Sequence, residues 1–190
     1  LLEILYFLIF ELLNSYMFII KNNYYLYIEN TKNIDLNYIK NNKKISIIYR
    51  NNNIEESLDS LRKFKKHCTV KGFKLYISNN IKLFRACKAD GLYLSSFNKK
   101  IYLNQKINLV GSAHSFKEVN EKIKQGCKTI FLSRLFQTSY KNKKSHFGVI
   151  KFNLFINKFR ITLVPLGGIN NSNLNKLNLV NSNGLALLSE

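Results

Sequence analysis

The chain has 190 residues, 46% of them hydrophobic, and its 30 Lys and Arg against 11 Asp and Glu give a formal net charge of +19. This length allows one domain with a sizeable buried core and is too short for two ordinary domains. The charge favours anionic partners, either nucleic acid or small phosphorylated and carboxylated ligands. Because the lysines are spread along the chain among many Asn and Ile residues, we interpret most of them as solvated.

The three cysteines, Cys68, Cys87 and Cys127, lie far apart in the sequence. None is spaced from another as in a metal site or a redox motif, so we expect no metal centre. Reduced cysteines in or near the core are typical of a cytoplasmic protein.

Residues 1–23 are an apolar lead-in segment. Glu3 and Glu11 interrupt it, and we expect no membrane span because a carboxylate near the centre of a bilayer is costly. No basic stretch followed by a small-residue cleavage site is found, so a secretory leader is not expected either. Two interpretations remain open: an amphipathic helix, or translated upstream sequence with the true start at Met17, the only methionine.

From residue 24 onward, short β-branched or aromatic runs alternate with longer amphipathic segments, which is the pattern of repeated βα units around a parallel sheet. Apolar residues recur every third or fourth position in several of the longer segments, which predicts helices. The helices are expected at Ile54–Val70, Asn80–Lys88, Ser115–Gln125 and Asn171–Leu179. Eight strands are expected, at Tyr24–Glu29, Ile45–Arg50, Phe73–Ser78, Gly91–Leu94, Asn108–Ser112, Lys128–Ser133, Ile161–Leu166 and Gly184–Leu188.

Local signals mark several element boundaries. Ser115 three residues before Glu118 predicts a capping box at the start of a helix. Glycines lie where helices give way to strands, and we expect left-handed caps there. These glycines are Gly72, Gly91, Gly126 and Gly184.

The eight predicted strands favour a single compact (β/α)8 barrel, a TIM barrel, over residues 24–190. No internal repeat and no linker other than the polar stretch Tyr140–Ser145 divides the chain. The alternative fold is a doubly wound open sheet. The sequence stops at Glu190 directly after the last predicted strand, so the last helix is expected to be short or missing, and self-association stays open.

The strongest local signal for function is the glycine pair Gly167 and Gly168, which follows the seventh predicted strand. Adjacent glycines let the backbone approach a ligand and present its amides, and barrels commonly bind phosphate in the loops after strands seven and eight. An ordinary tight turn is the alternative for an isolated glycine pair. The position at the end of the penultimate strand favours phosphate binding.

Five segments together resemble one known family in order and in spacing. They are Ile47–Arg50, Ala89–Leu94, Leu109–Glu118, Gly126–Lys141 and Leu166–Ile169. The family that they resemble is the thiamine phosphate synthase and TenI family, and the resemblance covers residues 24–190. Five segments in register, each at a strand end of the same predicted barrel, are more specific than any one motif.

The resemblance implies a phosphate site and a thiazole site. Amides of Gly168, Leu188 and Ser189 would bind the phosphate, Thr138 would form a hydrogen bond with the thiazole, and Lys141 would add positive charge. Taken alone, Thr138 is better interpreted as a turn residue and Lys141 as part of a solvated basic loop.

His114 is the candidate catalytic residue. In the TenI branch the resemblance implies that a histidine in the segment Gly-x-Ser-x-His-Ser moves the proton, and a neutral imidazole can take a proton from one position and return it at another. A histidine that only caps the following helix is the alternative. Arg50 and Ser112 are further candidates for substrate binding, whereas His67 and His146 are interpreted as structural or solvated.

The chain departs from the synthases at the positions that would hold magnesium. Synthases use acidic residues to hold Mg²⁺ on the leaving pyrophosphate, and a hard cation prefers carboxylate oxygens. Where the family has Asn-Asp after the third strand, this chain has Ser78-Asn79, and where a second Asp follows the fourth strand it has Phe97-Asn98. The resemblance therefore favours the tautomerase branch without a cofactor, and Mg²⁺ is expected only if the chain is a synthase.

We expect a thiamine-biosynthesis enzyme, a TenI-like thiazole tautomerase whose partner is a small-molecule thiazole phosphate. The alternative is a divergent thiamine phosphate synthase that joins a pyrimidine pyrophosphate to the thiazole phosphate. From another class, a non-catalytic phosphate-ligand sensor or a nucleic-acid binder would also explain the charge. Nucleic acid is not the expected partner, because the basic residues do not cluster with aromatic residues on one predicted face.

Overall fold

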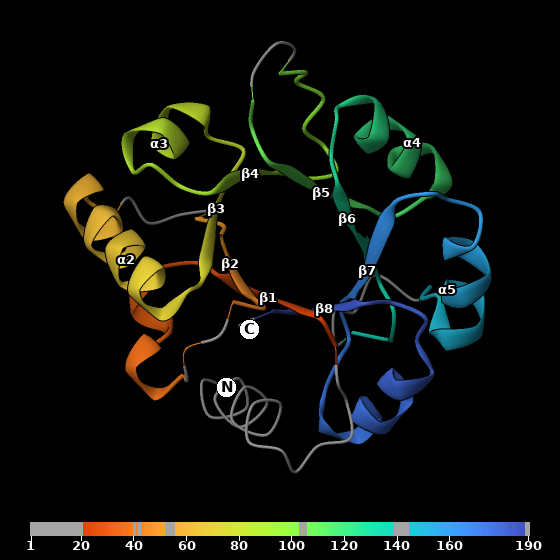
Figure 1. The fold of residues 1–190 in the computed structure, drawn as a ribbon. Coiled ribbons are helices and arrows are strands. Elements are labelled where there is room, and N and C mark those ends of the chain that lie inside the picture. Colours follow the sequence, from red (N-terminus) through yellow and green to blue (C-terminus); the bar gives the residue numbers. More distant parts are fainter. Residues whose placement is uncertain are drawn as a thin grey trace.

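The computed structural model describes residues 21–39, 41, 43–51, 56–102, 106–138 and 145–188. Eight parallel strands pair in chain order, and the last pairs with the first, so that the sheet closes into a barrel (Figure 1). Each end of a strand lies within one residue of its predicted position, which confirms the barrel and excludes the open sheet. The strands are β1 (Asn23–Ile28), β2 (Ile45–Tyr49), β3 (Lys74–Ser78), β4 (Gly91–Leu94), β5 (Leu109–Ala113), β6 (Thr129–Ser133), β7 (Thr162–Leu166) and β8 (Gly184–Leu188).

The helices surround the barrel on its outer side (Figure 1). They are α2 (Leu58–Lys71), α3 (Ile81–Ala86), α4 (Phe116–Lys124) and α5 (Gly148–Ile156), with 3-10 turns at η1 (Thr31–Asn33), η2 (Leu36–Tyr38) and η3 (Asn171–Leu179). Within the described ranges, no helix is long and apolar enough to cross a membrane. Residues 1–20, which carry most of the predicted lead-in segment and Met17, lie outside the described residues.

Two helix predictions differ from the structure. The helix predicted to begin at Ile54 begins at Leu58, because Ser57 caps it by accepting a hydrogen bond from the backbone N–H of Ser60. The segment Asn171–Leu179 is a 3-10 helix, with Asn170 and Asn173 in a reciprocal capping box at its start.

The sequence analysis did not predict α5. Its residues are apolar on most sides, so they show little helical periodicity, and the residue before it, Phe147, forms no side-chain capping bond. Phe152 is fully buried, whereas Ile150 and Leu154 are exposed. Packing of Phe152 against the barrel holds this helix in place, which a periodicity argument does not detect.

Two of the four glycines that we expected as left-handed caps have another role. Gly72 and Gly126 do adopt positive φ angles of 78° and 84°. Gly91 and Gly184 instead begin β4 and β8 and have no positive φ. A Cβ atom on Gly91 would lie 2.4 Å from the ring of Tyr76, so this glycine is needed for close packing inside the barrel.

Strand residues alternate between two hydrophobic clusters. One cluster takes alternate residues from all eight strands and fills the barrel, and the other lies between the strands and the helices. The phase of each strand therefore decides which side chains reach the interior. The inner cluster contains Tyr25, Tyr27, Ile48, Tyr76, Tyr93, Val110, Phe131, Val164, Leu166 and Ala186.

Candidate functional site

Aromatic rings form a layer inside the barrel below the carboxyl ends of the strands. The ring centroid of Tyr27 on β1 lies 5.5 Å from that of Tyr93 on β4 and 5.6 Å from that of Phe131 on β6. All three side chains are buried. The layer closes the barrel interior, so a ligand at the carboxyl end would lie above it, where the loops meet.

The predicted residue Arg50 follows β2 directly and continues the inward phase of Ile48. Burial raises the pKa of both Tyr27 and Tyr93, and the positive charge of Arg50 opposes the rise in each. The guanidinium therefore lies near both phenols at the carboxyl end of the barrel. Arg50 is only half-buried, which leaves part of its side chain accessible to an anion.

The predicted residue Ser112 lies on the inner face of β5 and is buried. The hydroxyl of Tyr93 donates a hydrogen bond to Ser112 Oγ at 2.9 Å. Because burial raises the pKa of Tyr93, its phenol keeps its hydrogen and acts as a donor. Ser112 already has a protein partner, and its role in substrate binding stays a prediction.

We call the loop residues Phe136, Gln137, Gly167, Gly168 and Ile169 the glycine side of the site. The backbone N–H of Phe136 donates to the carbonyl of Gly167 at 3.1 Å, so the loop after β6 lies along the end of β7. A Cβ on Gly168 would lie 2.3 Å from the carbonyl oxygen of Phe136 and 2.6 Å from that of Gln137. With a φ of 73° as well, only glycine fits at position 168.

The glycine side presents backbone donors. The amides of Gly168 and Ile169 donate to no acceptor within the part of the chain that the structure describes. The Gly168 carbonyl is held separately, since Asn173 Nδ2 donates to it at 2.7 Å. Two adjacent N–H groups with fixed orientation can bind one anion.

Arg134 fixes the loop after β6. Its guanidinium donates to Thr138 Oγ1 at 3.1 Å and to the carbonyl of Ser145 at 2.9 Å. Its side chain also packs against Gly167, because a Cβ added to that glycine would lie 3.2 Å from Arg134 Cγ. Thr138, predicted to contact the thiazole, thus accepts a bond within the protein and keeps one hydroxyl hydrogen to donate.

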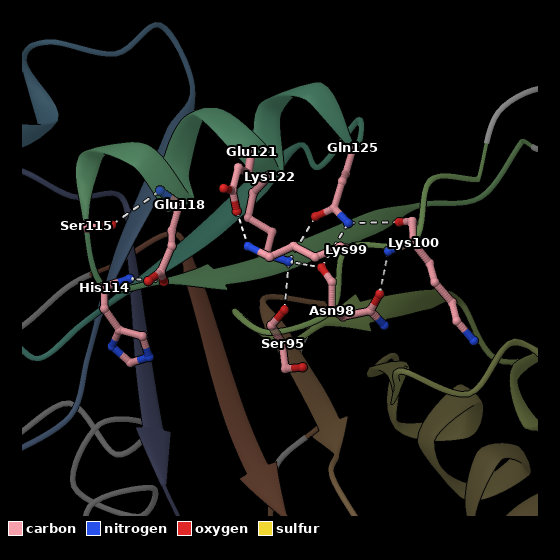
Figure 2. A network of polar contacts seen from close by, with 10 residues as sticks. All are labelled: Ser95, Asn98, Lys99, Lys100, His114, Ser115, Glu118, Glu121, Lys122 and Gln125. Atoms are coloured by element: carbon pink, nitrogen blue, oxygen red, sulfur yellow. Dashed lines mark hydrogen bonds and ion pairs between the residues drawn. The ribbon is translucent and has the colours of Figure 1, made fainter.

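His114 follows β5 directly, as predicted, and is exposed. Its backbone N–H donates to Glu118 Oε2 at 2.9 Å, while Ser115 Oγ accepts from the Glu118 N–H at 3.3 Å (Figure 2). The Glu118 side chain therefore accepts from the N–H of His114, one residue before the Ser115 N–H that the predicted capping box would use. The ring Nδ1 lies 3.2 Å from the Ser133 carbonyl, which can only accept, so Nδ1 is the donor in this contact.

Contacts join His114 to the glycine side. Ser133, whose carbonyl is next to the imidazole, ends β6 and pairs with Leu166 at the end of β7. Its Oγ would lie 3.3 Å from a Cβ on Gly167. The histidine and the glycine pair are therefore separated by the width of one strand.

We call Asn79, Ser95 and Asn98, in the loops after β3 and β4, the amide side of the site. Asn79 Oδ1 accepts hydrogen bonds from Asn98 Nδ2 at 2.9 Å and from the Ser95 backbone N–H at 3.0 Å. Asn79 Nδ2 donates to Ser95 Oγ at 2.9 Å. Asn79 and Asn98, which the resemblance predicts to replace two synthase carboxylates, are therefore bonded to each other.

The amide side does not fit a divalent metal ion. Asn79 and Asn98 are neutral, and their amide groups are already engaged with protein partners. Among the described residues, no group of three or more His, Cys, Asp and Glu side chains is placed to hold a metal. Mg²⁺ prefers an octahedral set of oxygens that includes carboxylates, and this arrangement offers none.

Three predicted site residues are described only in part or not at all. Lys141 and Ser189 lie outside the described residues. Leu188 ends β8, and its backbone pairs with Tyr27. Their roles in phosphate binding stay predictions.

Sequence reasoning missed three residues at this end of the barrel: Tyr27, Tyr93 and Arg134. The alternation along β1 and β4 carries the signal for both tyrosines. Tyr27 lies two residues after the inward-facing Tyr25, and Tyr93 is the third residue of the four-residue strand β4. Arg134 directly follows β6, a position that barrels use for functional residues.

Comparisons with known proteins identify relatives of this chain in sequence and in fold. A family model described as thiamine monophosphate synthase matches residues 31–190. A thiamine-phosphate synthase from Clostridium acetobutylicum is 26% identical over 136 residues, which cover 69% of this chain and 64% of that protein. Another, from Prochlorococcus marinus subsp. pastoris, is 26% identical over 128 residues, covering 65% of this chain and 36% of that protein. The chain thus spans less than two thirds of the length of both relatives.

Solved structures share the fold. A thiamine phosphate pyrophosphorylase from Pyrococcus furiosus is similar with a TM-score of 0.69 and 16% identity, covering 88% of this chain and 86% of that one. A 2-keto-3-deoxy-6-phospho-gluconate aldolase from Zymomonas mobilis has a TM-score of 0.56 and 12% identity, covering 88% of this chain and 82% of that one. At such identities these likenesses concern the barrel alone.

Proposed function

We propose that this chain, which belongs to the thiamine monophosphate synthase family, binds a thiazole phosphate of thiamine biosynthesis and acts on it as a tautomerase. One observation carries the proposal: the two positions that would hold magnesium carboxylates form a neutral amide pair, Asn79 and Asn98, while His114 stands one strand from the glycine side. A tautomerase needs a proton carrier and an anion site, and it has no pyrophosphate to activate.

The glycine side supports phosphate binding. The amides of Gly168 and Ile169, which have no acceptor among the described residues, would donate to the phosphate oxygens, with Leu188 and Ser189 as the proposed second donor group. Arg50 and Lys141 would add electrostatic attraction from two other loops. A phosphate in this position would hold the thiazole ring toward the strand ends.

His114 would move the proton. Its Nε2 lone pair would take a proton from one position of the thiazole ring, and the imidazolium would return a proton at another position, so that no net proton is consumed. The Ser133 carbonyl would stabilise the imidazolium by accepting from Nδ1–H. Positioned acid–base groups of this kind contribute about 10²–10⁴-fold to a rate.

The test is a tautomerisation assay with the wild type, His114→Ala and His146→Ala. The first variant should lose activity by about 100-fold or more with little change in KM, because one proton carrier is removed. His146 is exposed in the loop before α5 and serves as the matched control, which should keep wild-type rates. Equal rates for His114→Ala and the wild type would remove the catalytic claim and favour a phosphate-ligand sensor.

A divergent synthase is the second candidate, and the names of both curated relatives favour it. It predicts Mg²⁺-dependent joining of the pyrimidine pyrophosphate to the thiazole phosphate. Complementation of a synthase-deficient strain by the chain would support it directly. The absence of carboxylates from the amide side argues against it.

A further inference from the structure

A buried lysine lies behind the amide side. Lys122 on α4 has no exposed surface, although lysine is rarely buried without a charged partner. Its Nζ donates to the carbonyl of Ser95 at 2.7 Å, to the carbonyl of Asn98 at 2.8 Å and to Gln125 Oε1 at 2.9 Å (Figure 2). Three acceptors around one nitrogen match the three donors of an ammonium group, because a neutral amine has only two.

The surroundings are built for this side chain. A Cβ on Gly111 would lie 2.8 Å from Lys122 Cδ, so the glycine in β5 makes room for the lysine stem. Gln125 Nε2 donates to the carbonyls of Asn98 and Lys100 at 2.9 Å and 2.8 Å, and thereby binds the same loop. Burial lowers the pKa of Lys122, which shows that the charge is desolvated and that the three bonds must offset this.

The ammonium group is attached to the loop that carries the amide pair. Its acceptors include the backbone carbonyl of Asn98, whose side chain donates to Asn79. It also binds the carbonyl of Ser95, whose N–H and Oγ both contact Asn79. One buried positive charge therefore lies directly behind the positions at which a synthase would hold its cation.

We propose that Lys122 is the built-in cation of this barrel end: a positioning residue that fixes the loop after β4 through its carbonyls and excludes a divalent metal ion from the amide side. This role rests on the proposed function in one respect: the ammonium of Lys122 would make binding of the thiazole phosphate independent of Mg²⁺. The exclusion of metal is a property of the apoprotein and can be tested without any substrate.

The test measures Mn²⁺ affinity in a set of full-length variants. N79D/N98D restores two carboxylates without a change of shape, and Asp tolerates the positive φ of 56° at position 79. The ammonium should repel the metal, so N79D/N98D alone should bind Mn²⁺ weakly. Adding Lys122→Met should raise the affinity at least tenfold, while adding Lys124→Met, an exposed lysine of the same helix, should change it less than twofold.

Equal Mn²⁺ affinities with Lys122 and with Met at position 122 would overturn the proposal. If the triple variant does not fold, the wild type still decides. With ¹⁵N-labelled lysine at neutral pH, Lys122 Nζ should give a slowly exchanging ammonium signal, and a neutral amine would overturn the proposal. If the wild type shows no tautomerase activity in any assay while the Mn²⁺ results are as expected, the proposed function is rejected and the role of Lys122 stands.

Discussion

The two sides of the barrel mouth use their polar groups in opposite ways. On the amide side, the side chains of Asn79, Ser95 and Asn98 are bonded to one another, and Lys122 holds the carbonyls behind them. On the glycine side, the amides of Gly168 and Ile169 find no acceptor among the described residues. The polar side chains of the amide side are hydrogen-bonded within the protein, whereas the glycine side keeps backbone donors for a ligand.

This difference suggests which part of a two-substrate site persists. A synthase needs an anion site for the thiazole phosphate and a metal-assisted site for the pyrophosphate. The glycine side still suits the first ligand, because backbone amides do not depend on side-chain identity. The amide side does not suit the second, because Asn79 and Asn98 are neutral and bonded within the protein.

The largest effect is expected from Gly168→Ala on the glycine side. A left-handed alanine and a Cβ only 2.3 Å from the Phe136 carbonyl should together destabilise the chain by about 2–4 kcal/mol. The loop after β6 must also move away, so binding of the thiazole phosphate should be lost. Urea unfolding and titration calorimetry measure the two effects.

Gly148→Ala is the matched control for that substitution. Gly148 has a similar φ of 65°, but a Cβ there would meet nothing within 4 Å. Only the left-handed conformation is penalised, at about 1–2 kcal/mol, and ligand binding should be unchanged. If both alanine variants were equally stable and bound ligand equally, close packing at Gly168 would not matter to the site.

A smaller effect is expected from Asn98→Ala on the amide side. It removes the bond to Asn79 Oδ1 and the bond that Asn98 Oδ1 accepts from the Lys100 N–H, which should lower stability by about 1–3 kcal/mol. Binding of the thiazole phosphate should stay within twofold of the wild type, because the glycine side is untouched. Asn178→Ala, at an exposed position in η3, is the control and should cost less than about 0.5 kcal/mol. A large loss of binding in Asn98→Ala would mean that the amide side contacts the ligand.

The sequence predicted the barrel well and the two sides unequally. Each strand is a short buried run with its own phase, so local pattern was enough to place it. The glycine pair was recognised because Gly167 and Gly168 are adjacent and directly follow a strand. The reason only glycine fits at position 168 was not visible, because the obstructing carbonyl belongs to Phe136, in another loop.

The amide side depends on contacts that a pattern does not reveal. The bond between Asn79 and Asn98 joins two loops, and either residue alone reads as an ordinary loop asparagine. Most lysines were interpreted as solvated, whereas Lys122 is fully buried. Its burial follows from the space above Gly111, from two backbone carbonyl oxygens of the loop after β4 and from the side-chain oxygen of Gln125 at the end of its own helix. The signal available in the sequence was Gly111 in the middle of β5, together with Lys122 on the same face of the next helix as Val119.

The smallest effect separates the ligand end of the barrel from its opposite end. Tyr93→Phe removes the donor to Ser112 near the carboxyl ends of the strands, and Tyr76→Phe removes the acceptor of Asn108 Nδ2 near the amino ends. Each change should lower stability by about 0.5–1.5 kcal/mol, because each removes one hydrogen bond from a buried ring that stays packed. Only Tyr93→Phe should also weaken binding of the thiazole phosphate, by a few-fold, since Tyr93 belongs to the aromatic layer beneath the proposed ligand position. Calorimetric titration of both variants decides the matter, and equal affinities would place the ligand away from that layer.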